Sequence, residues 1–197
     1  MKLYDYPNQP IFLLAKCKYY DIKKRIYSNM DSFAIEKKIK KQEENKIDIY
    51  DCFELYTRRE EIRDIDWQCE SCNSIQIPYK QLLIHKPPLY LIIQFDRCFK
   101  KYSSFRSSYA FDDTLINFPI NNLDIDEYVE GPEKYKTTYN LYGAIYREVS
   151  SRNDNIYCVC KNNKKWIMFK DNKAVGVNGI VNKFVHFLFY RRSDLQD

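Results

Sequence analysis

Glycine and histidine are both scarce in this chain, with 4 and 2 residues respectively among 197. Aromatic residues are abundant instead, with 18 Tyr and 12 Phe. Because many aromatic residues and few glycines favour strands over helical bundles, we expect a domain rich in β-structure. The hydrophobic share of 45% is sufficient for a packed core, and the length fits one domain or part of a larger one.

Long hydrophobic runs are also absent. The apolar run at residues 89–95 is too short to span a membrane, and residues 1–10 lack the apolar core of a signal peptide. The 7 cysteines are odd in number. We therefore expect an intracellular protein, in the cytoplasm or the nucleus, with reduced thiols and no membrane partner.

The chain has no cluster of charge of one sign. Its net charge is +5, and the densest basic stretch, residues 37–41, runs straight into Glu43 and Glu44. Nucleic-acid binding usually needs a stronger and more clustered basic surface, so nucleic acid is not expected as the main partner. Such binding would require surface tyrosines and lysines grouped on one face of a sheet, which the sequence does not establish.

Two regions differ in pattern along the chain. Residues 1–46 form a mixed N-terminal segment or linker, with a short strand at 11–15 and a charged helical stretch at 30–45. Residues 47–194 form the second region, with a short helix at 51–56 and a loop at 100–108. Strands are expected at 81–85, 89–95, 139–145, 156–160, 166–169 and 185–190, and the second of these is apolar enough to be buried on both faces. We therefore predict an α+β fold that is mainly an antiparallel β-sheet.

Several motifs occur in one order in this second region. They are Asp51-Cys52-Phe53-Glu54-Leu55-Tyr56-Thr57, Trp67-x-Cys69-x-x-Cys72, Phe118-Pro119-Ile120, Tyr139-Asn140-Leu141, Lys165-Trp166-x-x-Phe169 and Leu188-Phe189-Tyr190-Arg191-Arg192. Together they resemble the C-terminal half of a ubiquitin-specific protease catalytic domain, from about residue 47 to 192 and more weakly through 15–38. The resemblance implies the palm and fingers of a papain-like cysteine peptidase fold, with the thumb subdomain missing.

Members of that family are thiol-dependent deubiquitinases, which hydrolyse the isopeptide bond at the C-terminus of ubiquitin. The reaction needs a Cys thiolate, a His that moves its proton and an acid or amide that orients the His. The family's Cys box is absent here, because Cys17 and Cys52 lack its Asn, Gly and Tyr neighbours. We interpret both cysteines as small hydrophobic residues.

The remaining catalytic positions are also altered. The family His position is Asn155, whose amide has no useful pKa for a general base, and the family Asp position is Lys170, a cation without an acceptor. The acid that follows, Asp171, has no histidine to orient, because His85 and His186 are both expected to be structural. The glycines of the family loop are Arg152, Asn153 and Asp154 here. Arg97 is retained from a family strand that is otherwise changed.

Cys69 and Cys72 have the spacing of half a tetrahedral zinc site. In the family the second Cys pair lies upstream, and Cys158 with Cys160 has the wrong spacing to replace it. A structural zinc is therefore expected only if a second Cys pair comes from elsewhere, and no other cofactor is implied.

Three functional hypotheses follow. The chain is a ubiquitin carboxyl-terminal hydrolase by descent that is inactive alone and needs a missing thumb half or another protein chain. Alternatively, it is a non-catalytic pseudoprotease that binds ubiquitin or a ubiquitinated protein, or scaffolds a partner. A third hypothesis, an unrelated basic β-domain that binds nucleic acid, has the least support.

Overall fold

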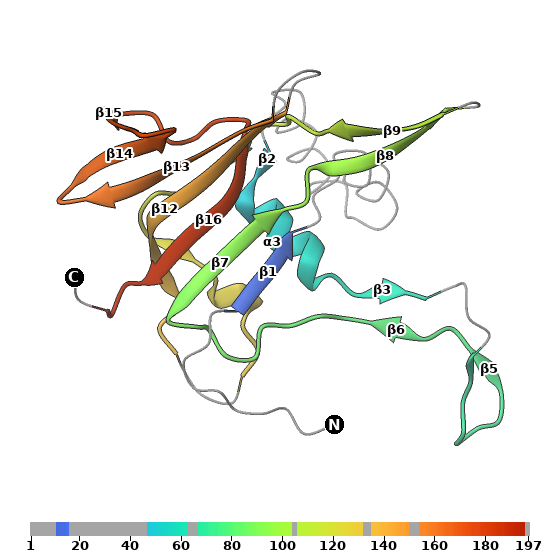
Figure 1. Ribbon diagram of the computed structural model, residues 1–197. Coiled ribbons are helices and arrows are strands. Elements are labelled where there is room, and N and C mark those ends of the chain that lie inside the picture. Colours follow the sequence, from blue (N-terminus) through green and yellow to red (C-terminus); the bar gives the residue numbers. More distant parts are fainter. Residues whose placement is uncertain are drawn as a thin grey trace, which may run out of the picture.

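Eight strands form the central sheet of the computed structural model (Figure 1). The structure describes residues 11–15, 47–62, 67–103, 106–131, 135–149 and 154–195. Across the sheet the order is β1 (Ile11–Ala15), β7 (Tyr90–Phe95), β16 (Val185–Arg192), β12 (Thr138–Val149), β13 (Asp154–Asn162), β14 (Lys165–Lys170) and β15 (Lys173–Val177). β11 (Leu123–Asp124) pairs with one end of β12. All these pairs are antiparallel except β1 with β7, which confirms the predicted fold class.

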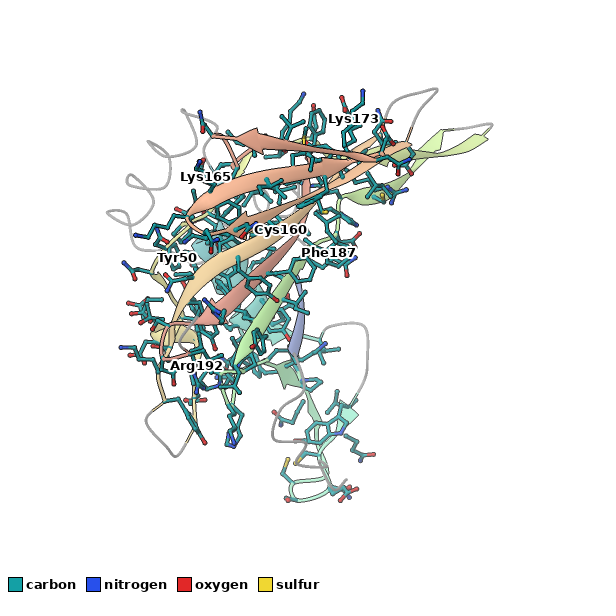
Figure 2. All side chains as sticks on the ribbon, turned by 60° about the vertical axis from the view of Figure 1, so that its left-hand side comes forward. Tyr50, Cys160, Lys165, Lys173, Phe187 and Arg192 are labelled. Carbon is teal, nitrogen blue, oxygen red and sulfur yellow. The ribbon has the colours of Figure 1, made fainter. Side chains whose placement is uncertain are left out.

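The hydrophobic core lies on one face of this sheet, beneath α3 (Ile49–Thr57). Asp48 caps the helix, because its carboxylate accepts hydrogen bonds from the backbone amides of Tyr50 and Asp51. Ile49, Cys52 and Phe53 form the buried side of the helix. In Figure 2, Tyr50 on the helix and Phe187 on β16 lie on opposite sides of the sheet. Within the described part of the chain, the helix therefore covers one face of the sheet and not the other.

Three tyrosines are fully buried in this core, and each donates its hydroxyl hydrogen bond to a backbone carbonyl. Tyr139 donates to Pro88 at 2.7 Å, Tyr146 to Ile180 at 2.6 Å and Tyr190 to Pro119 at 2.7 Å. Because a buried hydroxyl without a partner is costly, these bonds let aromatic residues fill the core and also fix the loops that carry the acceptors.

Four pairs of short strands surround the sheet. They are β2 (Ile47–Asp48) with β10 (Ile116–Asn117), β3 (Glu60–Glu61) with β6 (Tyr79–Lys80), β4 (Trp67–Gln68) with β5 (Ile75–Gln76), and β8 (Cys98–Ser103) with β9 (Arg106–Phe111). A single 3₁₀ turn, η1 (Asp126–Tyr128), lies among the described residues. The β3–β6 and β4–β5 pairs form an arm that extends away from the sheet (Figure 1). No helix in the described part of the chain is long and apolar enough to cross a membrane.

The structure differs from the sequence prediction at three elements. Residues 100–103 and 106–108, predicted as part of a loop, belong to the paired strands β8 and β9. Residues 81–85, predicted as a strand, contribute one isolated bridge from Ile84 to Val129. β7 alternates between buried and partly exposed residues, so only one face of it is buried. The helical stretch predicted at 30–45 lies outside the described residues.

Candidate functional site

The register of β13 and β14 brings together the two residues that the sequence analysis expects at the family's His and Asp positions. Asn155 lies near the start of β13, opposite Glu148 on β12. Lys170 ends β14, and because Cys158 pairs with Phe169, Lys170 lies beside Tyr157 on the neighbouring strand. Side chains two residues apart on a strand share a face, so Asn155, Tyr157 and Lys170 lie on one face of the sheet.

Tyr157 is the residue between these two positions that the sequence analysis did not single out. Its ring stacks on Tyr146, with the ring centroids 4.8 Å apart and an interplanar angle of 7°. The ammonium of Lys170 lies 5.8 Å from the Tyr157 ring centroid, within cation–π range. Burial raises the pKa of Tyr157, so the phenol stays protonated at neutral pH. Its i+2 spacing from Asn155 is the signal that could have identified it.

Asp171, the acid after the family Asp position, lies in the β14–β15 turn. Its φ angle is 46°, and the residue is exposed. The turn places Lys170 opposite Lys173 in the sheet, with Asp171 beyond the last pair. The position where the sequence analysis expects an orienting carboxylate has a lysine ammonium, which cannot accept a hydrogen bond from an imidazole.

An ion pair joins the two strands at the end where Asn155 lies. The Arg147 guanidinium donates to the Asp154 carboxylate through Nη2 at 2.6 Å and through Nε at 3.0 Å. Hydrogen bonding from Arg147 lowers the pKa of Asp154, and the same bonds raise the pKa of Arg147. Asp154, where the family resemblance predicts a glycine, therefore has a charged side chain that is bound to Arg147 on β12. The other two such positions, Arg152 and Asn153, lie outside the described residues.

Arg97 is buried and acts as a structural clamp. Its Nε donates to the Val185 carbonyl at 2.7 Å, and its Nη1 donates to the carbonyls of Asp112 and Thr114 at 3.0 and 2.8 Å. Burial lowers the pKa of this guanidinium, and Asp112 and Asp113 oppose that shift. These contacts join the end of β7 to β16 and to the segment after β9, and so hold the sheet together. Because Nε and Nη1 already donate to backbone carbonyls, these two atoms are not available to bind a substrate.

The two histidines are separated in the fold. His85 is exposed in the segment before β7. His186 lies on β16, where its ring meets Phe187 edge-on with the centroids 4.8 Å apart. Burial lowers the pKa of His186, and the nearby charges of Arg147 and Arg97 lower it further. The imidazole is therefore neutral at neutral pH.

Cys69 and Cys72 lie in the tight turn that connects β4 and β5. The backbone amide of Asn73 donates to the Cys69 carbonyl at 2.8 Å, and the Cys72 sulfur lies 2.9 Å from the Ser74 hydroxyl. Hydrogen bonds from Ser74 lower the pKa of Cys72, which favours the thiolate that a metal needs. The described residues contain no group of three or more His, Cys, Asp or Glu that could hold a metal. Two thiols are half of a tetrahedral set, so the residues fit zinc only with two further ligands.

The other cysteines differ in state. Cys98, Cys158 and Cys160 are free thiols, as are Cys69 and Cys72. Cys52 is buried on α3 and is disulfide-bonded, which differs from the expectation that all thiols are reduced. Burial raises the pKa of Cys160, so it is a poor nucleophile. Cys17 lies outside the described residues.

Comparison with known proteins identifies the same likeness over most of the chain. The family model described as ubiquitin carboxyl-terminal hydrolase matches residues 15–190. Human ubiquitin carboxyl-terminal hydrolase 15 is 30% identical over 184 residues, which cover 88% of this chain and 18% of that protein. Ubiquitin carboxyl-terminal hydrolase 10 of Arabidopsis thaliana is 29% identical over 158 residues, which cover 78% of this chain and 17% of that protein. The chain thus spans about a fifth of the length of these relatives.

A solved structure has a similar fold. It is that of the SAGA Ubp8/Sgf11/Sus1/Sgf73 DUB module bound to ubiquitin aldehyde. The TM-score is 0.64 and the identity 25%, and the match covers 76% of this chain and 34% of the other.

Proposed function

Because this chain belongs to the ubiquitin carboxyl-terminal hydrolase family, we propose that it is a member that binds ubiquitin, or a ubiquitinated protein, without cleaving it. The observation that carries the proposal is the arrangement of Asn155 and Lys170 around Tyr157. We align these two residues with the family's catalytic His and with the acid that orients it, and both lie on one sheet face.

The chemistry of this arrangement supports binding without turnover. A cysteine nucleophile needs a base that takes its proton and later returns it to the leaving amine. The Asn155 amide can do neither, and the Lys170 ammonium repels a protonated imidazole where the family carboxylate would stabilise one.

The Lys170 ammonium can also favour binding of free ubiquitin. The C-terminus of ubiquitin is a carboxylate, and a lysine ammonium favours a carboxylate where an aspartate would repel it. The Lys170 ammonium lies over the Tyr157 ring, on the face where the family cleaves the ubiquitin tail. We therefore expect binding to depend on Lys170 and on the charge of the ubiquitin terminus.

A second candidate is a deubiquitinase half that acts only with another chain. The arm supports this candidate, because Trp67, Ile75 and Ile77 are 46%, 70% and 56% exposed on it. Exposed apolar residues that are grouped in this way suit a protein partner. The solved relative, a module of several chains, is consistent with such assembly. In this candidate the partner supplies the thumb, including the nucleophile.

The experiment is a titration of labelled mono-ubiquitin into the purified chain, with a fluorogenic ubiquitin C-terminal substrate assayed on the same sample. We expect binding without turnover, and weaker binding for Lys170→Asp. Lys165→Asp, at the other end of β14, is the matched control and should bind as the unmodified chain does. Ubiquitin with an amidated C-terminus should bind equally well to Lys170→Asp and to the unmodified chain.

Two results would reject this proposal. Turnover by the chain alone would show that the reaction proceeds with Asn155 and Lys170 in place. Absence of both binding and turnover would favour the second candidate, which predicts turnover once a thumb-bearing chain is added.

A further inference from the structure

A groove of about 1050 Å³ lies at the end of the sheet opposite Asn155. We call it the sheet-end groove. Its walls come from the ends of β7, β12, β13 and β16 and from two turns, at residues 121–122 and 163–164. It is therefore separate from the site around Tyr157 and has no part in the proposed handling of ubiquitin.

The lining of this groove has one sign of charge. The charged side chains among its described lining residues are Lys161, Lys164 and Arg191, all cationic. Five of the other lining residues are asparagines, whose amides can both donate and accept hydrogen bonds. The combination suits a ligand that has anionic groups beside uncharged polar edges.

Two tyrosine rings provide the aromatic surface of the groove. Tyr90 on β7 and Tyr142 on β12 meet edge to face, with centroids 6.2 Å apart and an interplanar angle of 76°. They are 44% and 37% exposed. Tyr142 also packs against Phe189 at 6.3 Å, which holds its ring in place while one side stays accessible.

The turn between β13 and β14 places a lysine at the groove in a strained backbone conformation. Asn163 and Lys164 have φ angles of 44° and 69°, and the register makes them a two-residue hairpin turn. The second position of such a turn strongly favours glycine. A lysine there raises the energy of the folded chain, and strain of this kind at a surface turn points to a functional use of the side chain.

The opposite wall is held by backbone and amide hydrogen bonds. The Asn122 amide donates to the Asn140 side-chain oxygen at 3.1 Å, and the Leu141 amide donates to the Ile120 carbonyl at 2.8 Å. Asn122 has a φ angle of 57°, which asparagine tolerates well. The groove is therefore formed before any ligand binds.

The strands that line the groove exclude one mode of binding. Among the described strands, β7, β12, β13 and β16 each have a hydrogen-bonded neighbour on both sides. A peptide that binds by adding a strand to a sheet needs a free strand edge, which these four strands do not offer. Recognition must then use side chains, and cations beside aromatic rings and amides are the groups that hold phosphates and bases.

We propose that the sheet-end groove binds single-stranded nucleic acid, with Lys161 and Lys164 at the phosphates and Tyr90 and Tyr142 against the bases. Composition alone argues against nucleic acid as a partner, because the positive charge is spread along the sequence. The fold brings two tyrosines and two lysines together at this groove, a grouping that the sequence alone does not establish.

The test is fluorescence anisotropy of labelled ten-nucleotide oligouridine and oligothymidine with the purified chain, at about 50 mM salt. We expect saturable binding of both probes. Lys164→Gly removes one phosphate contact and relieves the strained turn, so it should weaken binding several-fold while raising the melting temperature. It should also lower the slope of log affinity against log salt by about 1. Tyr142→Leu should weaken binding with no change in that slope, and Lys173→Ala, outside the groove, should change neither.

Three outcomes would overturn the proposal. The first is no binding of either oligonucleotide. The second is Lys164→Gly and Tyr142→Leu binding as the unmodified chain does. The third is displacement of the probe by polyglutamate of equal charge as effectively as by unlabelled oligonucleotide, which would assign the groove to acidic peptides.

Discussion

The Nε atom of Arg97 donates a hydrogen bond of 2.7 Å to the carbonyl of Val185, a residue 88 positions further along the chain. Val185 begins β16, and Arg97 follows β7, so this bond fixes where the two strands start to pair. The same guanidinium holds the carbonyls of Asp112 and Thr114. One side chain therefore sets the position of three separate segments.

Replacement of this side chain should destabilise the fold. Arg97→Met keeps the length of the side chain but removes this donor from one buried and two partly buried carbonyls, so we expect a loss of about 2–4 kcal/mol in the free energy of unfolding. Urea denaturation followed by circular dichroism would measure it. Arg147→Met, which removes a partly exposed ion pair, is the control and should lose far less. Equal losses for the two variants would contradict the role of Arg97 as a clamp.

Gly131 should not tolerate a side chain. A Cβ atom at this position would lie 2.3 Å from the His85 carbonyl oxygen, and the backbone there is held because the Glu130 amide donates to the Ile84 carbonyl. We expect Gly131→Ala to lower the free energy of unfolding by about 1–3 kcal/mol. Gly179→Ala has no atom within 4 Å of the added carbon and should be neutral or slightly stabilising. Thermal unfolding of both variants tests the difference.

Stability should decline at alkaline pH. Burial raises the pKa values of Tyr139, Tyr146 and Tyr190 well above the usual value near 10. Above that pH the unfolded chain loses protons that the folded chain keeps, so each tyrosine lowers the free energy of unfolding by about 1.4 kcal/mol per pH unit. The contribution is fully present below pH 10 and is lost as pH rises through the folded-state pKa.

Urea titrations between about pH 9 and 11.5, with tyrosinate absorbance as a second signal, would measure this decline. Tyr146→Phe should lower its slope, because the phenylalanine has no proton to release. The same variant should cost about 1 kcal/mol at neutral pH through loss of the hydrogen bond to Ile180. A slope unchanged by the substitution would show that other groups cause the decline.

Zinc should bind weakly to this chain alone. Cys69 and Cys72 supply two thiolates, so we expect cobalt, used as a spectroscopic substitute, to show the thiolate charge-transfer bands of two sulfur ligands and not of four. Addition of a peptide containing a second Cys-x-x-Cys should convert the spectrum to the four-sulfur form and tighten binding. Cys69→Ser should abolish the two-sulfur spectrum of the chain alone and prevent the four-sulfur form when the peptide is added. A four-sulfur spectrum from the chain alone would contradict the half-site assignment.

Most of the main sheet could be predicted from sequence, because its strands alternate apolar and polar residues or match family motifs. The β8–β9 hairpin could not, since residues 98–103 and 106–111 have polar stretches without alternation and pair only with each other. Residues 81–85 look like a strand by composition, yet tertiary packing leaves them a single bridge at Ile84. β15 was also missed, since its short sequence contains a glycine and it pairs only with β14.

The two candidate sites differ in how far the sequence could predict them. Asn155 and Lys170 were singled out in the sequence because the motifs that resemble the family predict its His and Asp at these places. The role of Tyr157 depends on the pairing of β13 with β14, and the sheet-end groove depends on strands that are distant in sequence. Tyr90, Tyr142 and Lys164 meet only because β16 lies between β7 and β12. Local patterns contain no information about that order.

The place of β16 in the sheet also has a consequence for synthesis. A ribosome makes β7, β12, β13 and β14 first, and these strands form two separate groups until β16 pairs with β7 on one side and β12 on the other. Contacts between such distant segments form slowly, so the nascent chain has unpaired strand edges until β16 emerges. Elongation and chaperone access, more than local strand propensity, should therefore govern the yield of folded protein in the cell.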